Sequence, residues 1–473
     1  MNSLKTHYVF YYPFNYRQYD FVKLQQILKR NKFYHFTIDE EEFNETLYGP
    51  DIEVSHQLLK QFFYPFMEEK LLNNEISVRN FNRYSKKILC DGKMKTAFDD
   101  IPFTLLSADI NLCPFGIGIL AVRIQLADDV DLNAALSFGH FFRVLQPKID
   151  EELGTEITYD NFVFYNTDEL LLKKIAPFLE QFFVDYSSIH KNISKIPFFE
   201  DERMYVSAFF HLEEDAEIDE HLLYRAGQLN GRDKNGDPYI SSSNEEYIER
   251  FVQEHCYERW APKFHIITTL QGHIHLSSVN DESMKKYLNS FHSVSYYTLL
   301  IHYFYKLMLL KLVFEHSELK FSKDKDIVEE LIEQITKFAS RYYFSEVSAR
   351  SEGKEISHYF RKAFRIDGLY RETKETLEEL YRIQEDRSTD RLNKLIFILT
   401  IFSMISGIYG MNLVIEMLAE PFNISEIFSF TFFEWIALIL MVFGLLTLAL
   451  LILNQVYKYS ISYYGKVNRR RQR

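Results

Sequence analysis

Over the first 285 residues, short apolar and aromatic runs alternate with polar segments. Runs rich in β-branched and aromatic residues predict strands, namely HYVFYY, PFTLLSADINL, IGILAVRIQL, MYVSAFF and KFHIITTLQGHIHLSS. The stretch DELLLKKIAPFLEQFF at 168–183 has helical spacing of its apolar residues and predicts an amphipathic helix. This mixture predicts an α+β domain over residues 1–285.

From residue 286 onward the pattern becomes helical. A pair of helices is expected over 286–354, followed by a long stalk helix over 355–412. Leucines recur at helical spacing with charged residues between them, and neither Pro nor Gly interrupts the chain from Leu369 to Ser406. Nothing in the sequence therefore stops this helix before it reaches an apolar segment.

Two segments near the C-terminus lack charged residues altogether. They are LIFILTIFSMISGIYGM, 17 residues at 395–411, and IALILMVFGLLTLALLIL, 18 residues at 436–453. At 1.5 Å per residue each helix would be about 26 Å long, close to the ~30 Å hydrocarbon core of a bilayer. The pattern predicts two membrane spans, the second over 434–456, with a loop at 413–433 between them.

Basic residues flank both predicted spans on the same side of the membrane. Arg391 and Lys394 precede the first span, and RRRQR closes the tail at 457–473, whereas 413–434 contains no Lys or Arg. The positive-inside rule then places both termini in the cytoplasm and the loop outside. We expect a multi-pass protein of the cell (inner) membrane.

A third apolar run, VSYYTLLIHYFYKLMLLKLVF at 294–314, receives a different interpretation. It carries His302, Lys306 and Lys311, and two Lys side chains would be costly in the middle of a bilayer. We therefore predict a largely buried helix of the soluble part of the chain, within the helical pair at 286–354.

Net charge and cysteine usage exclude several classes of protein. The formal net charge is −13, which argues against a general nucleic-acid binder because phosphate contacts need clustered basic residues. The three cysteines, Cys90, Cys113 and Cys256, are scattered and form no CxxC motif. They predict reduced thiols instead of a disulfide framework or a structural zinc site.

The motifs that would indicate catalysis or metal binding are missing or incomplete. The turn DKNGDPYISSSN at 233–244 departs from a calcium-binding loop because Pro238 replaces Gly and Asn244 replaces Glu. His265, His273 and His275 lie on an expected hairpin, and no Cys accompanies them, so metal binding is not expected there. Because P-loop, GxSxG and HExxH motifs are absent, we expect neither an enzyme nor an organic cofactor.

The first apolar segment ends in GIYGMN, with Tyr409, Gly410, Met411 and Asn412 in succession. A YGMN sequence at this place in a two-span tail resembles the CorA family of Mg²⁺ channels, which includes related zinc transporters. The resemblance covers about 355–473. It implies a funnel-shaped homopentamer in the lipid bilayer, in which the first spans line a pore and the α+β domains form a cytoplasmic funnel.

The resemblance also implies roles for the motif. Gly410, Met411 and Asn412 would form the outer pore mouth, with Tyr409 as an interfacial anchor. A ring of Asn412 amides would hydrogen-bond to the waters of a hydrated Mg²⁺ without removing them, which suits an ion that dehydrates reluctantly. The alternative for Asn412 is a simple helix C-cap.

Positions deeper in the pore follow from helical spacing back from Asn412 together with the family pattern. The pore-lining candidates are Gly407, Ser403, Thr400, Leu392 and Asp386. Leu392 matches the hydrophobic constriction of the family and is the gate candidate. Thr400 departs from the family pattern, which commonly has Met there. Ser403 and Thr400 have an alternative role, a hydrogen bond to a carbonyl of their own helix.

Glutamates follow the motif in the loop. Glu416 and Glu420 would attract divalent cations to the pore mouth, although the loop is longer than is usual in the family. The expected function is transport of Mg²⁺, with Co²⁺ or Ni²⁺ as further cargo, down the electrochemical gradient and gated by cytoplasmic Mg²⁺. Two alternatives stay open: a zinc transporter of the same fold, and a sensor or enzyme that is merely tethered to the membrane.

Overall fold

The computed structural model describes most of the chain. The described residues are 1–38, 47–49, 52, 54–148, 154–184, 203–214, 216–319, 325–410, 431–433, 435–436, 439, 442–443, 446 and 450. They fall into two compact units, Met1–Thr376 and Leu377–Arg473, and each is described by itself.

The first unit is built on a sheet of 12 strands within the described residues. Its main path runs β10-β11-β12-β9-β1-β5-β4-β3-β7-β8, and every pairing is antiparallel except β9 with β12. The strands are β1 (Asn2–Asn15), β2 (Tyr34–His35), β3 (Asn82–Lys95), β4 (Asp100–Leu112), β5 (Ile117–Leu126), β6 (Val130–Asp131), β7 (Glu156–Tyr159), β8 (Phe162–Phe164), β9 (Tyr205–Leu212), β10 (Cys256–Ala261), β11 (Phe264–Thr268) and β12 (Gly272–Ser277).

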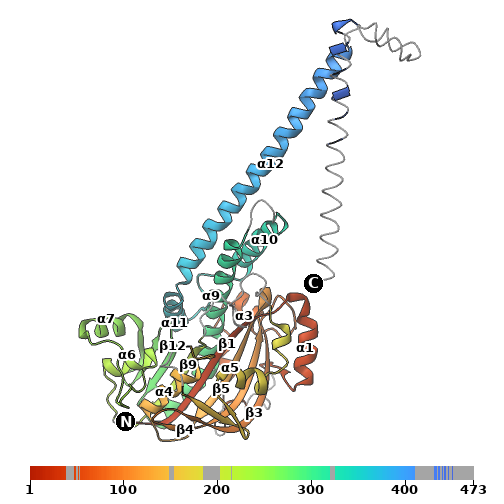
Figure 1. Ribbon diagram of the computed structural model, residues 1–473. Helices are drawn as coiled ribbons and strands as arrows, with labels where there is room; N and C mark the ends of the chain where they lie inside the picture. Colours follow the sequence, from red (N-terminus) through yellow and green to blue (C-terminus); the bar gives the residue numbers. More distant parts are fainter. Residues whose placement is uncertain are drawn as a thin grey trace. The chain divides into compact units, whose positions relative to one another are not determined.

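Helices cover both faces of this sheet (Figure 1). The helices of the first unit are α1 (Phe21–Arg30), α3 (Pro65–Leu71), α4 (Leu132–Phe142), α5 (Thr167–Leu170), α6 (Glu220–Gln228), α7 (Glu245–His255), α8 (Asp281–Ser290), α9 (Tyr296–Ser317), α10 (Lys325–Arg341) and α11 (Ser351–Ala363), and α12 (Ile366–Gly410) continues from the first unit into the second. Short helical turns complete them: η1 (Gln18–Asp20), η3 (His56–Leu59), η4 (Pro114–Gly116), η6 (Leu171–Ile175), η7 (Glu180–Phe182) and η8 (Phe291–Ser295), of which the last joins α8 to α9.

Several helices begin where a polar side chain satisfies a free backbone N–H. The side chains of Asp219, Asn244 and Asn280 each accept a hydrogen bond from the backbone N–H three residues further on, at the start of α6, α7 and α8. Such capping contributes about 1 kcal/mol per helix. The local sequence therefore fixes where these helices start.

One face of the sheet is apolar. The alternating side chains of Tyr8 and Phe10 on β1 pack against Phe138 and Phe142 of α4, and the ring centroids of Phe10 and Phe142 are 4.7 Å apart. The apolar cluster continues through α1, α5, α6 and the central strands. This face follows the period-two pattern that predicts strands and forms the main core of the unit.

The opposite face of the sheet packs against η8 and α9. The helical run Asp281–Ser317 is the one helix in the described part of the chain that is long and apolar enough to cross a membrane, and 72% of its most apolar window is buried inside the protein. Leu299, Phe304 and Leu309 are fully buried in it. The prediction of a buried helix over 294–314 is confirmed.

The polar side chains of α9 find partners within the fold. The ammonium group of Lys311 donates a hydrogen bond of 2.9 Å to the carbonyl of Phe115. That of Lys306 lies 5.3 Å from the ring centroid of Phe364. These contacts explain how an apolar helix with two lysines is accommodated next to the sheet.

The stalk helix differs from expectation at its start. Residues 351–363 form the separate helix α11, and α12 begins only at Ile366. Arg365 between them is left-handed, with φ of 52°, and buried Phe364 packs 4.9 Å from the ring centroid of Tyr205. Burial of Phe364 turns the chain without Pro or Gly, so the expected start at 355 is wrong.

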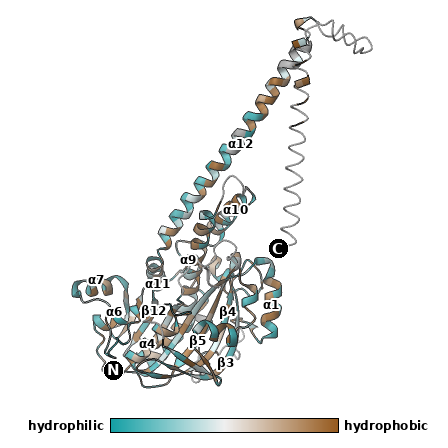
Figure 2. Cartoon of the chain, viewed as in Figure 1, coloured by the Kyte–Doolittle hydropathy of each residue, from teal (hydrophilic) through white to brown (hydrophobic). Residues whose placement is uncertain are grey.

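From Ile366 the helix α12 continues to Gly410 without a break. Its colouring in Figure 2 changes from mostly hydrophilic to more hydrophobic toward Gly410. The expected helical pair over 286–354 corresponds to the run Asp281–Ser317 and to α10, which ends at Arg341, so 342–350 lie outside helices.

Candidate functional site

The candidate pore positions before residue 411 lie on α12. At about 100° per residue, six of them fall within an arc of about 120° on one side of the helix. These are Asp386, Leu392, Thr400, Ser403, Gly407 and Gly410. The position of Tyr409 falls on the opposite side. The predicted pore-lining positions therefore share one stripe of the helix, and the position of the predicted anchor lies on the opposite side.

The described side chains on this stripe are open to solvent in the single chain. Asp386 and Ser403 are exposed, and Leu392 is 56% exposed. The hydroxyl of Thr400 donates a 2.8 Å hydrogen bond to the carbonyl of Ile396. For Thr400 this is the alternative role expected from the sequence, a bond to a carbonyl of its own helix.

The most specific part of the motif lies outside the described residues. Met411, Asn412, Glu416 and Glu420 lie outside the described residues, and Tyr409 is described only by its backbone. The roles of these residues stay predictions from the sequence.

Around the stripe, α12 exposes large apolar side chains on several sides. Leu395, Ile396, Phe397 and Leu399 are 56–69% exposed. Phe432 and Phe433, at the end of the predicted loop, are also exposed, as are the described apolar residues of the second predicted span: Trp435, Ile436, Ile439, Val442, Phe443, Leu446 and Leu450. Exposed apolar surface of this extent marks a site for a membrane or a partner protein.

The first unit contains a buried ionic cluster that sequence reasoning missed. The guanidinium groups of Arg83 and Arg123 lie 3.0 and 2.6 Å from the same oxygen, Oδ2 of Asp109. All three side chains are almost fully buried. They come from β3, β5 and β4, so only the pairing of these strands brings them together.

Hydroxyl groups complete this cluster. Ser85 donates a 2.7 Å hydrogen bond to Oδ1 of Asp109, and Tyr296 of α9 donates one of 2.9 Å to Oδ2. Burial raises the pKa of Asp109, but Arg123 and Arg83 outweigh that effect and leave the pKa below its usual value. The carboxylate therefore stays charged and joins α9 to the sheet.

The same face of the sheet buries several histidines. Nε2 of His273 lies 3.0 Å from Nε2 of His275, and Nδ1 of His273 lies 2.9 Å from the hydroxyl of Thr268. Burial lowers the pKa of His273 to about 3, so the ring is neutral at pH 7. The predicted hairpin, with both histidines on one face, is confirmed as β11 and β12.

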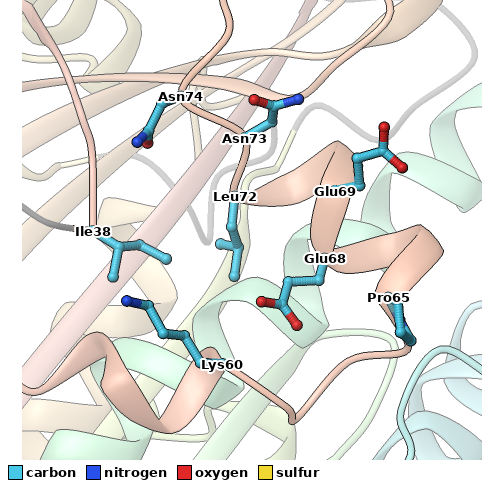
Figure 3. A pocket seen from close by; sticks show the side chains of 8 residues that line it. All are labelled: Ile38, Lys60, Pro65, Glu68, Glu69, Leu72, Asn73 and Asn74. Carbon is cyan, nitrogen blue, oxygen red and sulfur yellow. The ribbon is translucent and has the colours of Figure 1, made fainter.

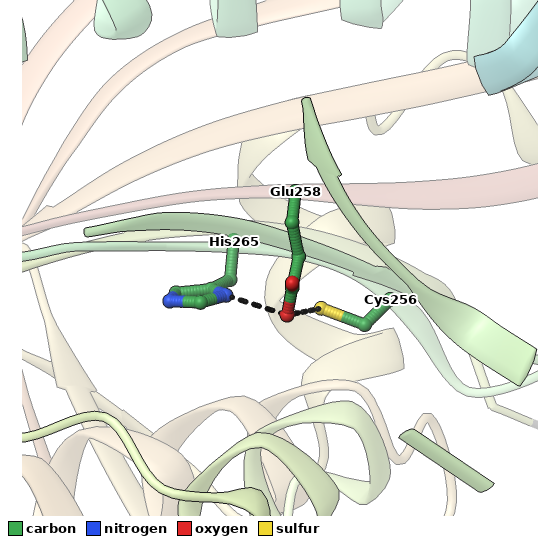
Figure 4. A group of neighbouring side chains, drawn as sticks. All are labelled: Cys256, Glu258 and His265. Carbon is green, nitrogen blue, oxygen red and sulfur yellow. Dashed lines mark hydrogen bonds and ion pairs between the residues drawn. The ribbon is translucent and has the colours of Figure 1, made fainter. Parts of the chain in front are cut away.

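His265 lies in a different setting, which contradicts the expectation that no Cys accompanies these histidines. Cys256 of β10 is close to it, together with Glu258, as Figure 4 shows. Sequence reasoning missed the trio because its members lie on two strands. Only the antiparallel pairing of β10 with β11 brings them together.

Two further places gather polar groups. In the predicted turn, the carboxylate of Asp233 accepts hydrogen bonds from the backbone N–H groups of Asn235 and Asp237, which confirms a tight turn. A surface pocket at α3 brings Lys60 and Glu68 toward the same space (Figure 3). The pocket is lined by Ile38, Lys60, Pro65, Glu68, Glu69, Leu72, Asn73 and Asn74.

Comparisons with protein-family models, with curated proteins and with solved structures found no match to this chain.

Proposed function

We propose that this chain is a membrane protein that moves a divalent cation, Mg²⁺ in the first place, through a pore formed by five copies. The observation that carries the proposal is the end of α12. There, exposed apolar side chains at 395–399 share the helix with the stripe of predicted pore-lining positions that leads to GMN at 410–412.

The exposed side chains support the membrane part of the proposal. A helix with Leu395, Phe397 and Leu399 more than half exposed needs an apolar environment from outside the described chain. Lipid can cover part of it, and neighbouring copies of the same helix can cover the rest. The basic residues that flank both apolar segments give the orientation.

The stripe supports the pore part of the proposal. Gly407 and Gly410 permit close approach of helices, and the hydroxyl of Ser403 can face a hydrated ion. Leu392 can close the pore by dewetting, and Glu416 and Glu420 can raise the local cation concentration at the mouth. An inside-negative potential supplies about 4.6 kcal/mol per 100 mV for a divalent ion, so no nucleotide is required.

The proposal includes feedback control. Cytoplasmic Mg²⁺ would bridge carboxylates of neighbouring subunits and hold the pore closed, because carboxylate oxygens are the ligands that Mg²⁺ prefers. This step supplies a reason for the acidic composition of the chain, which carries 67 Asp and Glu residues against 54 Lys and Arg residues.

The test is ion flux into proteoliposomes that hold a Mg²⁺ indicator. The full-length protein should give Mg²⁺ influx that Asn412→Ala lowers at least about tenfold, the loss expected when a site central to conduction is removed. Asn74→Ala, the same change at an exposed position of the first unit, serves as the matched control and should leave the flux unchanged.

Each other outcome has a distinct meaning. No Mg²⁺ flux from a protein that purifies as a pentamer would overturn the proposal. Flux of Zn²⁺ alone would select the zinc transporter of the same fold. Unchanged flux in Asn412→Ala would remove the filter role from the motif.

A further inference from the structure

Three potential metal ligands of different chemistry meet on the hairpin β10–β11. Each of Cys256, Glu258 and His265 offers one ligand atom, and these atoms lie within 4.8 Å of one another. Figure 4 shows the three side chains pointing toward a common point. None of the candidate pore residues takes part in this cluster.

The fold builds this cluster from strand alternation. Cys256 and Glu258 are two residues apart on β10 and share one face of the strand. Cys256 pairs with Ile267 of β11, and His265 lies two residues before Ile267, on that same face. Tyr257 pairs with Ile266, and the same register continued by one residue places Glu258 opposite His265.

The distances are close to those of a tetrahedral zinc site. Nδ1 of His265 lies 3.1 Å from Oε1 of Glu258, and Sγ of Cys256 lies 3.7 Å from the same oxygen. With bond lengths of 2.0–2.3 Å, neighbouring ligands of tetrahedral Zn²⁺ are about 3.3–3.6 Å apart. The third pair, Nδ1 of His265 and Sγ of Cys256, lies within 4.8 Å.

The surroundings fit three protein ligands and a water molecule. Cys256 is buried, the His265 side chain is 12% exposed and that of Glu258 is 56% exposed. The buried side of the site therefore holds the sulfur, and the fourth position opens toward solvent. One thiolate and one carboxylate would balance the charge of a divalent ion.

We propose that Cys256, Glu258 and His265 bind Zn²⁺, with water as the fourth ligand. Sulfur and imidazole nitrogen are ligands that Zn²⁺ prefers and that Mg²⁺ does not. On binding, the Cys256 thiol releases its proton to solvent and the sulfur forms a bond to zinc. The neutral His265 ring supplies the lone pair of Nδ1. The site does not depend on transport, and its absence would leave the proposed function untouched.

Cobalt substitution tests the site in the full-length protein in detergent. Metal-free protein is titrated with Co²⁺, whose bond to a thiolate gives a charge-transfer absorption band in the near ultraviolet. The band should saturate at one equivalent per chain and disappear when Zn²⁺ is added. Cys256→Ser should abolish it, whereas Cys90→Ser, the matched change at a half-buried cysteine away from the cluster, should retain it.

The other two ligands are tested by affinity. Glu258→Gln and His265→Asn should each weaken Co²⁺ binding at least about tenfold while the band still forms at high Co²⁺. A wild-type protein without the band, or a band that survives in Cys256→Ser, would overturn the proposal.

A folding defect in Cys256→Ser would not leave the matter open. X-ray absorption of the wild-type protein with one equivalent of Zn²⁺ should then show one sulfur neighbour at about 2.3 Å. A first shell of nitrogen and oxygen alone would equally overturn the site.

Discussion

Two helices of this protein carry apolar stretches in opposite surroundings. In α9, Leu299, Phe304 and Leu309 are fully buried against the sheet and its neighbouring helices. In α12, Phe397 and Leu399 are 66% and 69% exposed. The partners of the polar residues in these two stretches differ as well.

Polar groups of α9 reach other elements of the fold. Tyr296 donates a hydrogen bond to Asp109 of β4, and Lys311 donates one to the carbonyl of Phe115. The apolar part of α12 from 395 to 402 has only Thr400 as a polar residue, and its hydroxyl bonds to its own helix. The first helix completes a core, and the second carries surface that something else must cover.

The prediction with the largest expected effect tests this comparison of α9 with α12 through one matched pair of variants. Ile301→Asp places a carboxylate in a fully buried position of α9 and should cost more than about 4 kcal/mol, enough to prevent folding of the first unit. Leu399→Asp, at an exposed position of α12, should leave the unfolding of the first unit unchanged.

The measurement is denaturant unfolding of the full chain in detergent. The chain has two Trp residues, so a Trp435→Phe background leaves Trp260 on β10 as the fluorescent reporter of the first unit. Equal loss of stability in both variants would contradict the comparison. For Leu399→Asp we expect a different defect, loss of recovery from membranes, because a carboxylate at the centre of a span is expensive.

The second effect concerns the ionic anchor of α9. Asp109→Asn leaves Arg83 and Arg123 buried without their counter-ion and should destabilise the first unit by about 3–5 kcal/mol. The exposed pair Lys93–Asp100 gives the control, because Asp100→Asn should cost at most about 1 kcal/mol. A smaller loss in Asp109→Asn than in Asp100→Asn would show that the cluster does not anchor α9.

Local patterns in the sequence were sufficient for the elements that depend on local forces. The strand-rich first part, the hairpin of His273 and His275, the turn at Asp233 and the buried helix at 294–314 all follow from alternation, turn residues and charge spacing. The break before α12 did not, because Arg365 carries no turn signal and the cause is burial of Phe364 against distant residues.

Sites assembled by strand pairing were also beyond the sequence. Asp109 meets Arg83 and Arg123 only through the register of three strands, and Cys256 meets His265 only through the pairing of β10 with β11. Neither leaves a spacing signal along the chain. The pore motif differs from these sites because its residues are contiguous and can be recognised from the sequence. Its key residue, Asn412, lies outside the described residues.

The third prediction concerns the pH dependence of stability that the buried ring of His302 on α9 should cause. Burial lowers the pKa of His302 to about 4, against about 6.5 when unfolded, so the folded state binds fewer protons between these values. The neutral ring therefore contributes fully to the free energy of unfolding above pH 6.5, and this contribution is lost as the pH falls toward 4. Between pH 6.5 and 5 the free energy of unfolding should fall by about 2 kcal/mol.

The variant His302→Phe removes this titration and keeps a ring stacked on Phe360. As the pH falls from 6.5 to 5, the unfolding free energy of the variant's first unit should decrease less steeply than that of the wild type. The difference between the two slopes should be about 1.4 kcal/mol per pH unit. His358→Phe, which changes a histidine on α11 that is not buried, is the control and should leave the steepness unchanged. An unaltered slope in His302→Phe would mean that this ring is not held neutral by burial.

The smallest effect concerns Thr400, the one polar residue in the exposed apolar part of α12. Its hydroxyl already has an acceptor, the carbonyl of Ile396, so Thr400→Ala should change helix stability by only about 0.5 kcal/mol. In the proteoliposome assay it should lower Mg²⁺ flux much less than Asn412→Ala does. A loss as large as that of Asn412→Ala would show that the hydroxyl leaves its own helix and faces the ion, and α12 would then carry a polar contact that, like those of α9, reaches beyond its own backbone.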